Sequence, residues 1–311
     1  MTTPPAPDVT EAVSALMPEL RRGARASLAL MALALGLAGG IALLILNSAM
    51  DQRDRWEWAL YAAAAGGFAV FMLYRWTRSS QESLIMPILA RTIGLTYAKS
   101  ASPFIQALPK RLLPERSVRQ GEDHLTGTLG AHAIQMAEVT AETGGKNSKT
   151  LFKGIVAQFP NRTAMPAFFI AQEEKTRPGF FFGGDLSTEG LHHLRDLVAG
   201  GRTYGIWTSW EKGPEPPALS AVIDILTSLE TRLGPGVELY AATSNGVEMH
   251  VALSHKRNLF RLGGLFPAED RLFADVQQAM QDLTIPLTLA LALIQAEETA
   301  VEKVNRASPL E

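Results

Sequence analysis

Two long runs without charged residues stand near the start of the chain. The first covers residues 26–50 (ASLALMALALGLAGGIALLILNSAM), and the second lies within residues 57–76 and is free of charge from Trp58 to Tyr74. A helix needs about 20 predominantly apolar residues to cross the hydrocarbon core of a bilayer. The pattern therefore predicts a transmembrane hairpin over residues 27–76, with spans at about 27–49 and 57–76.

Aromatic residues bracket the second run. Trp56 and Trp58 precede it, and Tyr74 and Trp76 follow it. A helix rises 1.5 Å per residue, so Trp58 and Tyr74 stand about 24 Å apart, near the spacing of the two interfacial aromatic belts of a bilayer. We therefore predict that these four side chains are membrane-interface anchors.

Two other readings of the runs fit less well. A buried helix of a soluble protein also tolerates Ala and Gly, but two long charge-free runs in succession favour the membrane. A cleaved signal peptide has a shorter leader and a shorter apolar core, and no second span follows it.

Positive charges beside the spans predict the orientation, because Lys and Arg are enriched in cytoplasmic segments. Arginines precede the first span, lie in the connection and follow the second span, at Arg21, Arg22, Arg25, Arg53, Arg55, Arg75, Arg78 and Arg91. The bias is modest and places both termini in the cytoplasm and the connection outside.

Small residues recur four apart in both spans, at Gly36 and Gly40 and at Ala62 and Gly66. Such spacing lets helices approach closely, within the hairpin or in a dimer formed through the same faces. The alternative is that small residues are simply common in alanine-rich membrane helices.

The chain divides around this hairpin. Residues 1–26 form an N-terminal leader, in which residues 9–26 (VTEAVSALMPELRRGARA) have the pattern of a short amphipathic helix on the membrane surface. Residues 79–305 are long enough for one water-soluble domain, and residues 306–311 form a tail.

Residues 79–305 predict an α+β domain with an antiparallel sheet packed by helices. Alternating patterns indicate strands, and Asn245-Gly246 joins two of them as a tight hairpin turn. The strands are expected within 124–143, 151–159, 165–174 and 237–254, and the helices within 79–97, 185–197, 216–236 and 269–283. The last apolar run, residues 285–294, is too short to span a bilayer and predicts a helix packed on the sheet.

Composition excludes several classes of site. The chain has 311 residues with no cysteine, so disulfides and thiolate chemistry are excluded. The formal charge of −2 gives no reason to expect nucleic acid as a partner. Residues 144–150 (GGKNSKT) lack the spacing of a phosphate loop and predict a turn between strands. No cofactor or metal site is predicted.

The histidines suggest weak candidates for chemistry. His192 and His193 are adjacent on a predicted helix, where their side chains diverge, so a solvated face is favoured over a metal site. His250 is expected on the wet face of its hairpin. Asp123, His124, His132 and Glu138 are the candidates for an acid-base site, although no recognisable catalytic frame surrounds them.

Two further segments are candidate interaction surfaces. Phe180, Phe181 and Phe182 stand between Pro178-Gly179 and Gly183-Gly184, either as an exposed loop or as a core strand. Lys256 and Arg257 belong to a small basic cluster that is either solvated or close to anionic headgroups.

The order of these segments resembles a bacterial family designated domain of unknown function 3137. The features that carry the resemblance are Leu113-Pro114, Glu122-Asp123, Gly127, Glu138 and Phe152-Lys153-Gly154, with a later match around Phe260. The likeness spans roughly residues 79–300 and is weak between about 170 and 212. It implies a membrane-anchored α+β domain in bacteria, and it implies no activity.

The sequence therefore predicts a multi-pass protein of the bacterial inner membrane whose partners are the lipid bilayer and either a second protein or another copy of itself. The predicted role is a non-enzymatic binding or assembly module. The alternative is a membrane-anchored enzyme with a site near Asp123, His124, His132 and Glu138.

Overall fold

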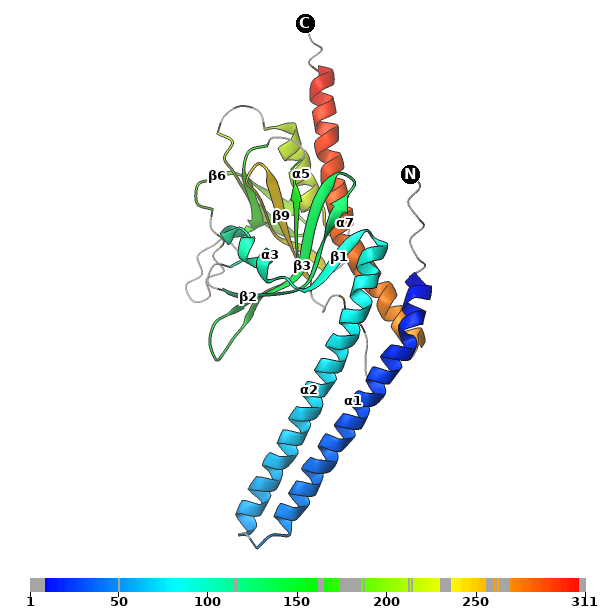
Figure 1. Cartoon of the computed structure of the whole chain (residues 1–311). Coiled ribbons are helices and arrows are strands. Elements are labelled where there is room, and N and C mark those ends of the chain that lie inside the picture. Colours follow the sequence, from blue (N-terminus) through cyan, green and yellow to red (C-terminus); the bar gives the residue numbers. More distant parts are fainter. Residues whose placement is uncertain are drawn as a thin grey trace. The chain divides into compact units, whose positions relative to one another are not determined.

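The computed structural model describes residues 9–49, 51–114, 117–161, 165–173, 186, 188–211, 213, 215–229, 236–255, 260, 262 and 269–307 (Figure 1). The chain falls into two compact units. The first contains Met1–Thr92 and Phe260–Met280, and the second contains Ile93–Leu259 and Gln281–Glu311. Each unit is described by itself.

Two long helices pack as a hairpin in the first unit. Helix α1 covers Val9–Leu46 (38 residues) and helix α2 covers Gln52–Thr92 (41 residues). At 1.5 Å per residue they are about 57 and 62 Å long, well beyond the roughly 30 Å of a hydrocarbon core. Residues 9–26 are therefore the first turns of α1 and not a separate surface helix.

Helix α2 likewise continues past the second span and through Pro87. A proline inside a helix removes one backbone hydrogen bond and costs about 3 kcal/mol. Ile85, Met86, Leu89 and Ala90 are fully buried on either side of it. Burial of these side chains offsets the cost, so the helix predicted for residues 79–97 is the end of α2, and a strand begins at Leu95.

The two helices are in close contact at Gly66. A methyl group on Gly66 would overlap the Cβ atom of Ala38, whereas nothing lies within 4 Å of a Cβ atom added to Gly36 or Gly40. The prediction of close packing is therefore confirmed for Gly66. The Gly36–Gly40 pair takes no part in the hairpin contact.

Among the described residues, three helices are long and apolar enough to cross a membrane, in the ranges Glu11–Leu46, Gln52–Thr92 and Asp270–Thr299. In α1 and α2 only 6% and 11% of the most apolar stretch is buried within the protein, against 44% in the third, which belongs to α7 (Glu269–Ala307). The first two therefore present apolar side chains outward, as lipid-facing helices do.

Helix α7 has a different surface. Leu283, Leu289 and Leu293 are buried, while Gln281 and Thr284 are among the exposed residues. The predicted helix over residues 285–294 is confirmed, and this part of α7 lies along the sheet (Figure 1). An outer face that carries Gln and Thr fits a helix packed on a protein core better than one surrounded by lipid.

The second unit is built on a nine-stranded sheet whose pairs are all antiparallel. The strand order is β1-β2-β3-β4-β9-β8-β5-β7-β6. The strands are β1 (Leu95–Ser100), β2 (Ser117–Leu129), β3 (His132–Thr143), β4 (Thr150–Pro160), β5 (Phe168–Gln172), β6 (His192–Ala199), β7 (Arg202–Thr208), β8 (Val237–Ser244) and β9 (Glu248–His255). The described helices beside them are α3 (Ser102–Ala107), the 3-10 helix η1 (Lys110–Leu112) and α5 (Pro217–Thr227). The predicted α+β class is confirmed.

Strand β6 corrects one prediction. His192 and His193 lie on this edge strand and not on a helix. The missed signal is Gly200-Gly201, whose φ angles of +57° and +75° form the tight turn of the β6–β7 hairpin. Two successive positive φ angles favour glycine and match the twist of a two-residue hairpin.

One face of the sheet carries several alanine side chains. Ala137, Ala171, Ala241 and Ala252 lie on this face, which we call the alanine face, and they form one buried cluster with residues of α3 and η1. Small floor residues let Phe104, Leu112 and Leu113 pack close to the sheet. This arrangement places η1 beside the ends of β8 and β9.

Candidate functional site

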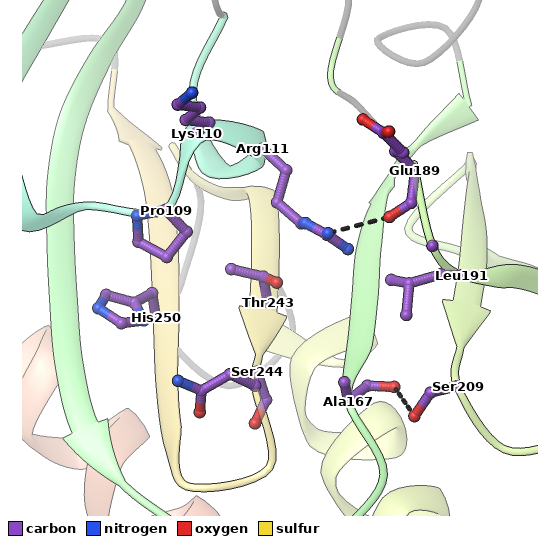
Figure 2. A pocket seen from close by; sticks show the side chains of 12 residues that line it. Pro109, Lys110, Arg111, Ala167, Glu189, Leu191, Ser209, Thr243, Ser244 and His250 are labelled. Carbon is purple, nitrogen blue, oxygen red and sulfur yellow. Dashed lines mark hydrogen bonds between the residues drawn. The ribbon is translucent and has the colours of Figure 1, made fainter.

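A pocket of about 600 Å³ opens on the alanine face, at the end of the sheet where β8 turns into β9. Ligand pockets in proteins commonly measure about 300–1,000 Å³. Three walls contribute: the β8–β9 end of the sheet, η1 with the residue before it, and the segment that leads into β6 (Figure 2). The lining residues are Pro109, Lys110, Arg111, Ala167, Glu189, Gly190, Leu191, Ser209, Thr243, Ser244, Asn245 and His250.

His250 and Thr243 are direct cross-strand neighbours in β9 and β8, so their side chains share one face of the sheet. His250 is only 6% exposed, which corrects the prediction that it lies on a wet surface. The alternation of residues in β9 was a poor guide because β9 lies between β4 and β8, inside the sheet, where both faces are covered. Burial lowers the pKa of His250 to about 4, so the imidazole is neutral at pH 7.

The His250 ring has no hydrogen bond to any other residue in the described part of the chain. A neutral imidazole carries one N–H donor and one acceptor nitrogen. The ring nitrogens are not among the fully enclosed side-chain atoms that lack a partner, so they are open to the pocket. A molecule bound there can supply the missing donor and acceptor.

Two cationic residues stand on the η1 wall. The Arg111 guanidinium donates from Nη2 to the backbone carbonyl of Glu189 at 3.0 Å, which ties η1 to the segment before β6 (Figure 2). Lys110 is exposed at the rim. Within the described residues neither side chain forms an ion pair with a carboxylate.

Side-chain hydrogen bonds hold the walls in place. The Thr243 hydroxyl donates to the Phe168 carbonyl at 3.1 Å. Ser244 Oγ accepts from Asn161 Nδ2 at 2.7 Å and from the Gly246 N–H at 3.0 Å. Because the Thr243 hydroxyl donates its hydrogen to a backbone carbonyl, its oxygen can still accept a hydrogen bond from a group in the pocket.

The residues of the predicted acid-base site do not converge. Asp123 and His124 form a bulge opposite β3, and Asp123 has a φ angle of +55°. The Asp123 carboxylate is buried and accepts from the Tyr97 hydroxyl at 2.7 Å and from Lys99 Nζ at 3.2 Å. Left-handed backbone is tolerated by Asp better than by most residues, and these two contacts fix the side chain.

His124 points away from that carboxylate, to the alanine face. Its ring stacks on Phe104, with centroids 5.3 Å apart, and its Nε2 lies 3.3 Å from Gln135 Oε1. Successive residues of a strand point to opposite faces of the sheet. The side chains of Asp123 and His124 therefore have different surroundings and do not contact a common group.

His132 and Glu138 lie at other points of the sheet. His132 opens β3 and pairs with Leu129, about 10 Å along the strand from Gln135, at roughly 3.3 Å per residue. Glu138 is buried opposite Glu122. His132 thus lies apart from His124, Glu138 lies across from the residue before Asp123, and none of the four residues lines the pocket described above.

The structure also shows where the remaining candidates lie. Residues 144–149 form the β3–β4 turn, which is closed by a hydrogen bond from the Thr143 N–H to the Lys149 carbonyl at 2.9 Å, and strand β4 follows as predicted. His193 Nε2 lies 2.7 Å from Asp196 on the solvated edge strand. Among the described residues, no three His, Cys, Asp or Glu side chains group as metal ligands.

The predicted interaction surfaces differ in how far they can be followed. Phe180, Phe181, Phe182, Lys256 and Arg257 lie outside the described residues. The proposed membrane anchors Trp56, Trp58 and Trp76 are exposed on α2, whereas Tyr74 is half-buried. Their role at the bilayer interface stays a prediction. The pocket itself was missed by sequence reasoning, because its walls come from segments far apart in the chain, such as Arg111 and Glu189, which are separated by 78 positions.

Fold and site together define an α+β domain with an open pocket, on a chain whose first two helices are suited to a membrane. No protein-family model matches the chain, and a search of curated proteins gives no match. The resemblance to domain of unknown function 3137 therefore stays a prediction.

Among solved structures, the mycobacterial trehalose monomycolate transport factor A, TtfA, is similar at 9% sequence identity and a TM-score of 0.34. The alignment covers 64% of this chain and 93% of that one. A likeness at this level carries no conclusion about fold or function, so the function is argued from the residues.

Proposed function

We propose that the protein is a membrane-anchored binding module without a catalytic role, and that its cytoplasmic α+β domain holds a ligand in the pocket beside η1. The hairpin of α1 and α2 supports the anchoring, because its apolar side chains face outward. The family resemblance supports a bacterial inner membrane, and the arginine distribution supports cytoplasmic termini.

The observation that carries the proposal is the set of polar and charged groups that are available for binding in the pocket. It combines a buried imidazole without a hydrogen-bond partner and two cations without an ion pair, within the described residues. Groups of this kind are stabilised by a bound molecule that supplies the missing partners.

A catalytic reading of the same pocket is disfavoured by the geometry. A hydroxyl nucleophile needs its proton directed to a base. The Thr243 hydroxyl instead donates to the Phe168 carbonyl, although His250 is its cross-strand neighbour.

Native mass spectrometry of the intact chain, purified from its own membranes in mild detergent, tests the proposal. We expect a bound species at a fixed ratio to the protein. Replacing Ser209, an exposed lining residue, by Trp fills the pocket and should remove that species. Thr128→Trp, on an exposed position of β2 outside the pocket, is the matched control and should retain it. A chain that carries nothing, or a species that both variants retain, would contradict the proposal.

A further inference from the structure

We propose that the ligand of this pocket carries an anionic group, phosphate or carboxylate, which is held by Lys110 and Arg111, and an uncharged polar part that reaches His250 and Thr243. This inference rests on the proposed function and narrows it to a class of ligand. The anionic group belongs either to the headgroup of a lipid or to a free metabolite.

The charges of the lining favour an anion. Lys110 and Arg111 are adjacent in η1, and Glu189 is the acidic residue among those that line the pocket. Arg111 contacts the backbone carbonyl of Glu189, so its positive charge is not neutralised by that contact. An arginine has five N–H donors, and those not used by the carbonyl can bind two oxygens of a phosphate or carboxylate.

The cationic wall is held in place before any ligand arrives. Leu112 and Leu113 are fully buried directly after the two cations. The Arg119 guanidinium donates to the carbonyls of Lys110 at 3.2 Å and Leu113 at 2.9 Å. A wall fixed by burial and hydrogen bonds loses little conformational freedom on binding, which favours affinity.

The sheet side of the pocket suits an uncharged polar group. His250 offers one donor and one acceptor, and Thr243 offers acceptor capacity, so a hydroxyl or amide finds complementary partners there. The cavity of about 600 Å³ holds the volume of roughly twenty waters at about 30 Å³ each. An inorganic anion alone leaves most of that space unfilled.

Titration calorimetry on the full chain in a neutral detergent tests the inference with matched probes. The anionic probes are glycerol 3-phosphate, glycerate and dihexanoyl phosphatidylglycerol. Glycerol and dihexanoylglycerol are the counterparts that lack the anionic group. We expect at least one anionic probe to bind, with an affinity that falls as salt is raised, and the uncharged counterparts not to bind.

Two variants separate the pocket from general surface charge. Lys110→Gln combined with Arg111→Gln should weaken binding of the anionic probe about tenfold or more, because charge-assisted hydrogen bonds are lost. Lys146→Gln removes an exposed cation from the β3–β4 turn and should leave binding unchanged. Neither η1 residue is buried, and a thermal melt verifies that the double variant is folded.

Each outcome decides the inference. Binding of the lipid probe alone identifies a headgroup, and binding of a soluble anion identifies a metabolite. Equal binding of an uncharged counterpart, an affinity unaffected by the double variant, or no anion binding up to about 10 mM overturns the inference. If native mass spectrometry then shows a neutral molecule that Ser209→Trp removes, the binding function stands and only the assignment of charge falls.

Discussion

At the scale of single residues, His250 links the stability of the domain to pH. Its pKa is about 4 in the fold and about 6.5 in an unfolded chain, so between these values the unfolded state binds more protons. The stabilisation is therefore complete above about pH 6.5 and is lost as the pH falls toward 4. Lys110, Arg111 and Glu189 are the other charged residues that line the pocket, and they are the same in the His250→Asn variant and in the unchanged protein.

We expect the free energy of unfolding to be about 1 kcal/mol lower at pH 5.5 than at pH 7, from the His250 contribution alone. His250→Asn should remove this difference, because the amide does not titrate. Denaturant unfolding of the full chain in detergent, followed by tryptophan fluorescence, measures it. His132→Asn changes a half-exposed histidine at the start of β3 and should keep the difference. An unchanged pH response in His250→Asn would rule out this origin.

Residue patterns predicted the positions of turns correctly, but they did not predict which side chains are buried. Asn245-Gly246 predicted the β8–β9 hairpin because that turn requires a positive φ, and Gly246 has φ +93°. The same alternation placed His250 in solvent, since it cannot distinguish an inner strand from an outer one. Whether a side chain is buried depends on the order of strands in the sheet, which the local sequence does not determine.

At the scale of elements, the α1–α2 hairpin depends on one small residue. Gly66 faces Ala38 with no room for a side chain, and Gly67 faces open space. Gly66→Leu should force the helices apart and destabilise the hairpin by about 1–3 kcal/mol, as overpacking of a tight contact does. Unfolding by SDS from a mild detergent, followed by circular dichroism, should show a lower midpoint.

Gly67→Leu is the matched control for this change. It adds the same side chain one residue along α2, on a surface with nothing within 4 Å. Its midpoint should equal that of the unchanged protein. Equal midpoints for both variants would mean that the close contact at Gly66 adds no stability.

The ends of α1 and α2 were not predictable from the apolar runs alone. The two apolar runs identified the spans, but not the turns of helix that extend them to Val9 and Thr92. Each of those extensions contains charged residues and one proline, Pro18 or Pro87, so the sequence pattern indicated a leader and the start of the soluble domain. Their helical state follows from burial of one stripe, including Val13, Met17 and Leu20, and burial is a tertiary effect.

At the scale of the whole molecule, the orientation in the membrane is open to a direct test. The chain has no cysteine, so a single introduced thiol reports one position. Gln52→Cys lies at the first residue of α2, next to the connection with α1, and Val247→Cys lies at the tip of the β8–β9 hairpin, where Val247 is 70% exposed.

An impermeant maleimide added to intact cells should label Cys at position 52 and spare Cys at position 247. Both positions should react after the cells are broken open, which controls for thiol access. Labelling of position 247 from outside would reverse the proposed topology and with it the cytoplasmic placement of the pocket.

The class of the fold was predictable, and the candidate site was not. Hairpin turns, strand alternation and apolar runs are local, and they indicated an anchored α+β domain. The pocket joins η1, the segment before β6 and the β8–β9 turn, which meet only because β5 and β7 extend the sheet past β8. The acid-base candidates illustrate the converse, since Asp123 and His124 are neighbours in sequence but their side chains have different partners on opposite faces of the strand.

The length of α1 has a consequence for work at the start of the chain. Roughly half of this helix exceeds what a bilayer covers, and its inward stripe at Val13, Met17 and Leu20 is enclosed by protein. Deleting residues 1–26 would therefore remove buried packing contacts of the first unit and destabilise it.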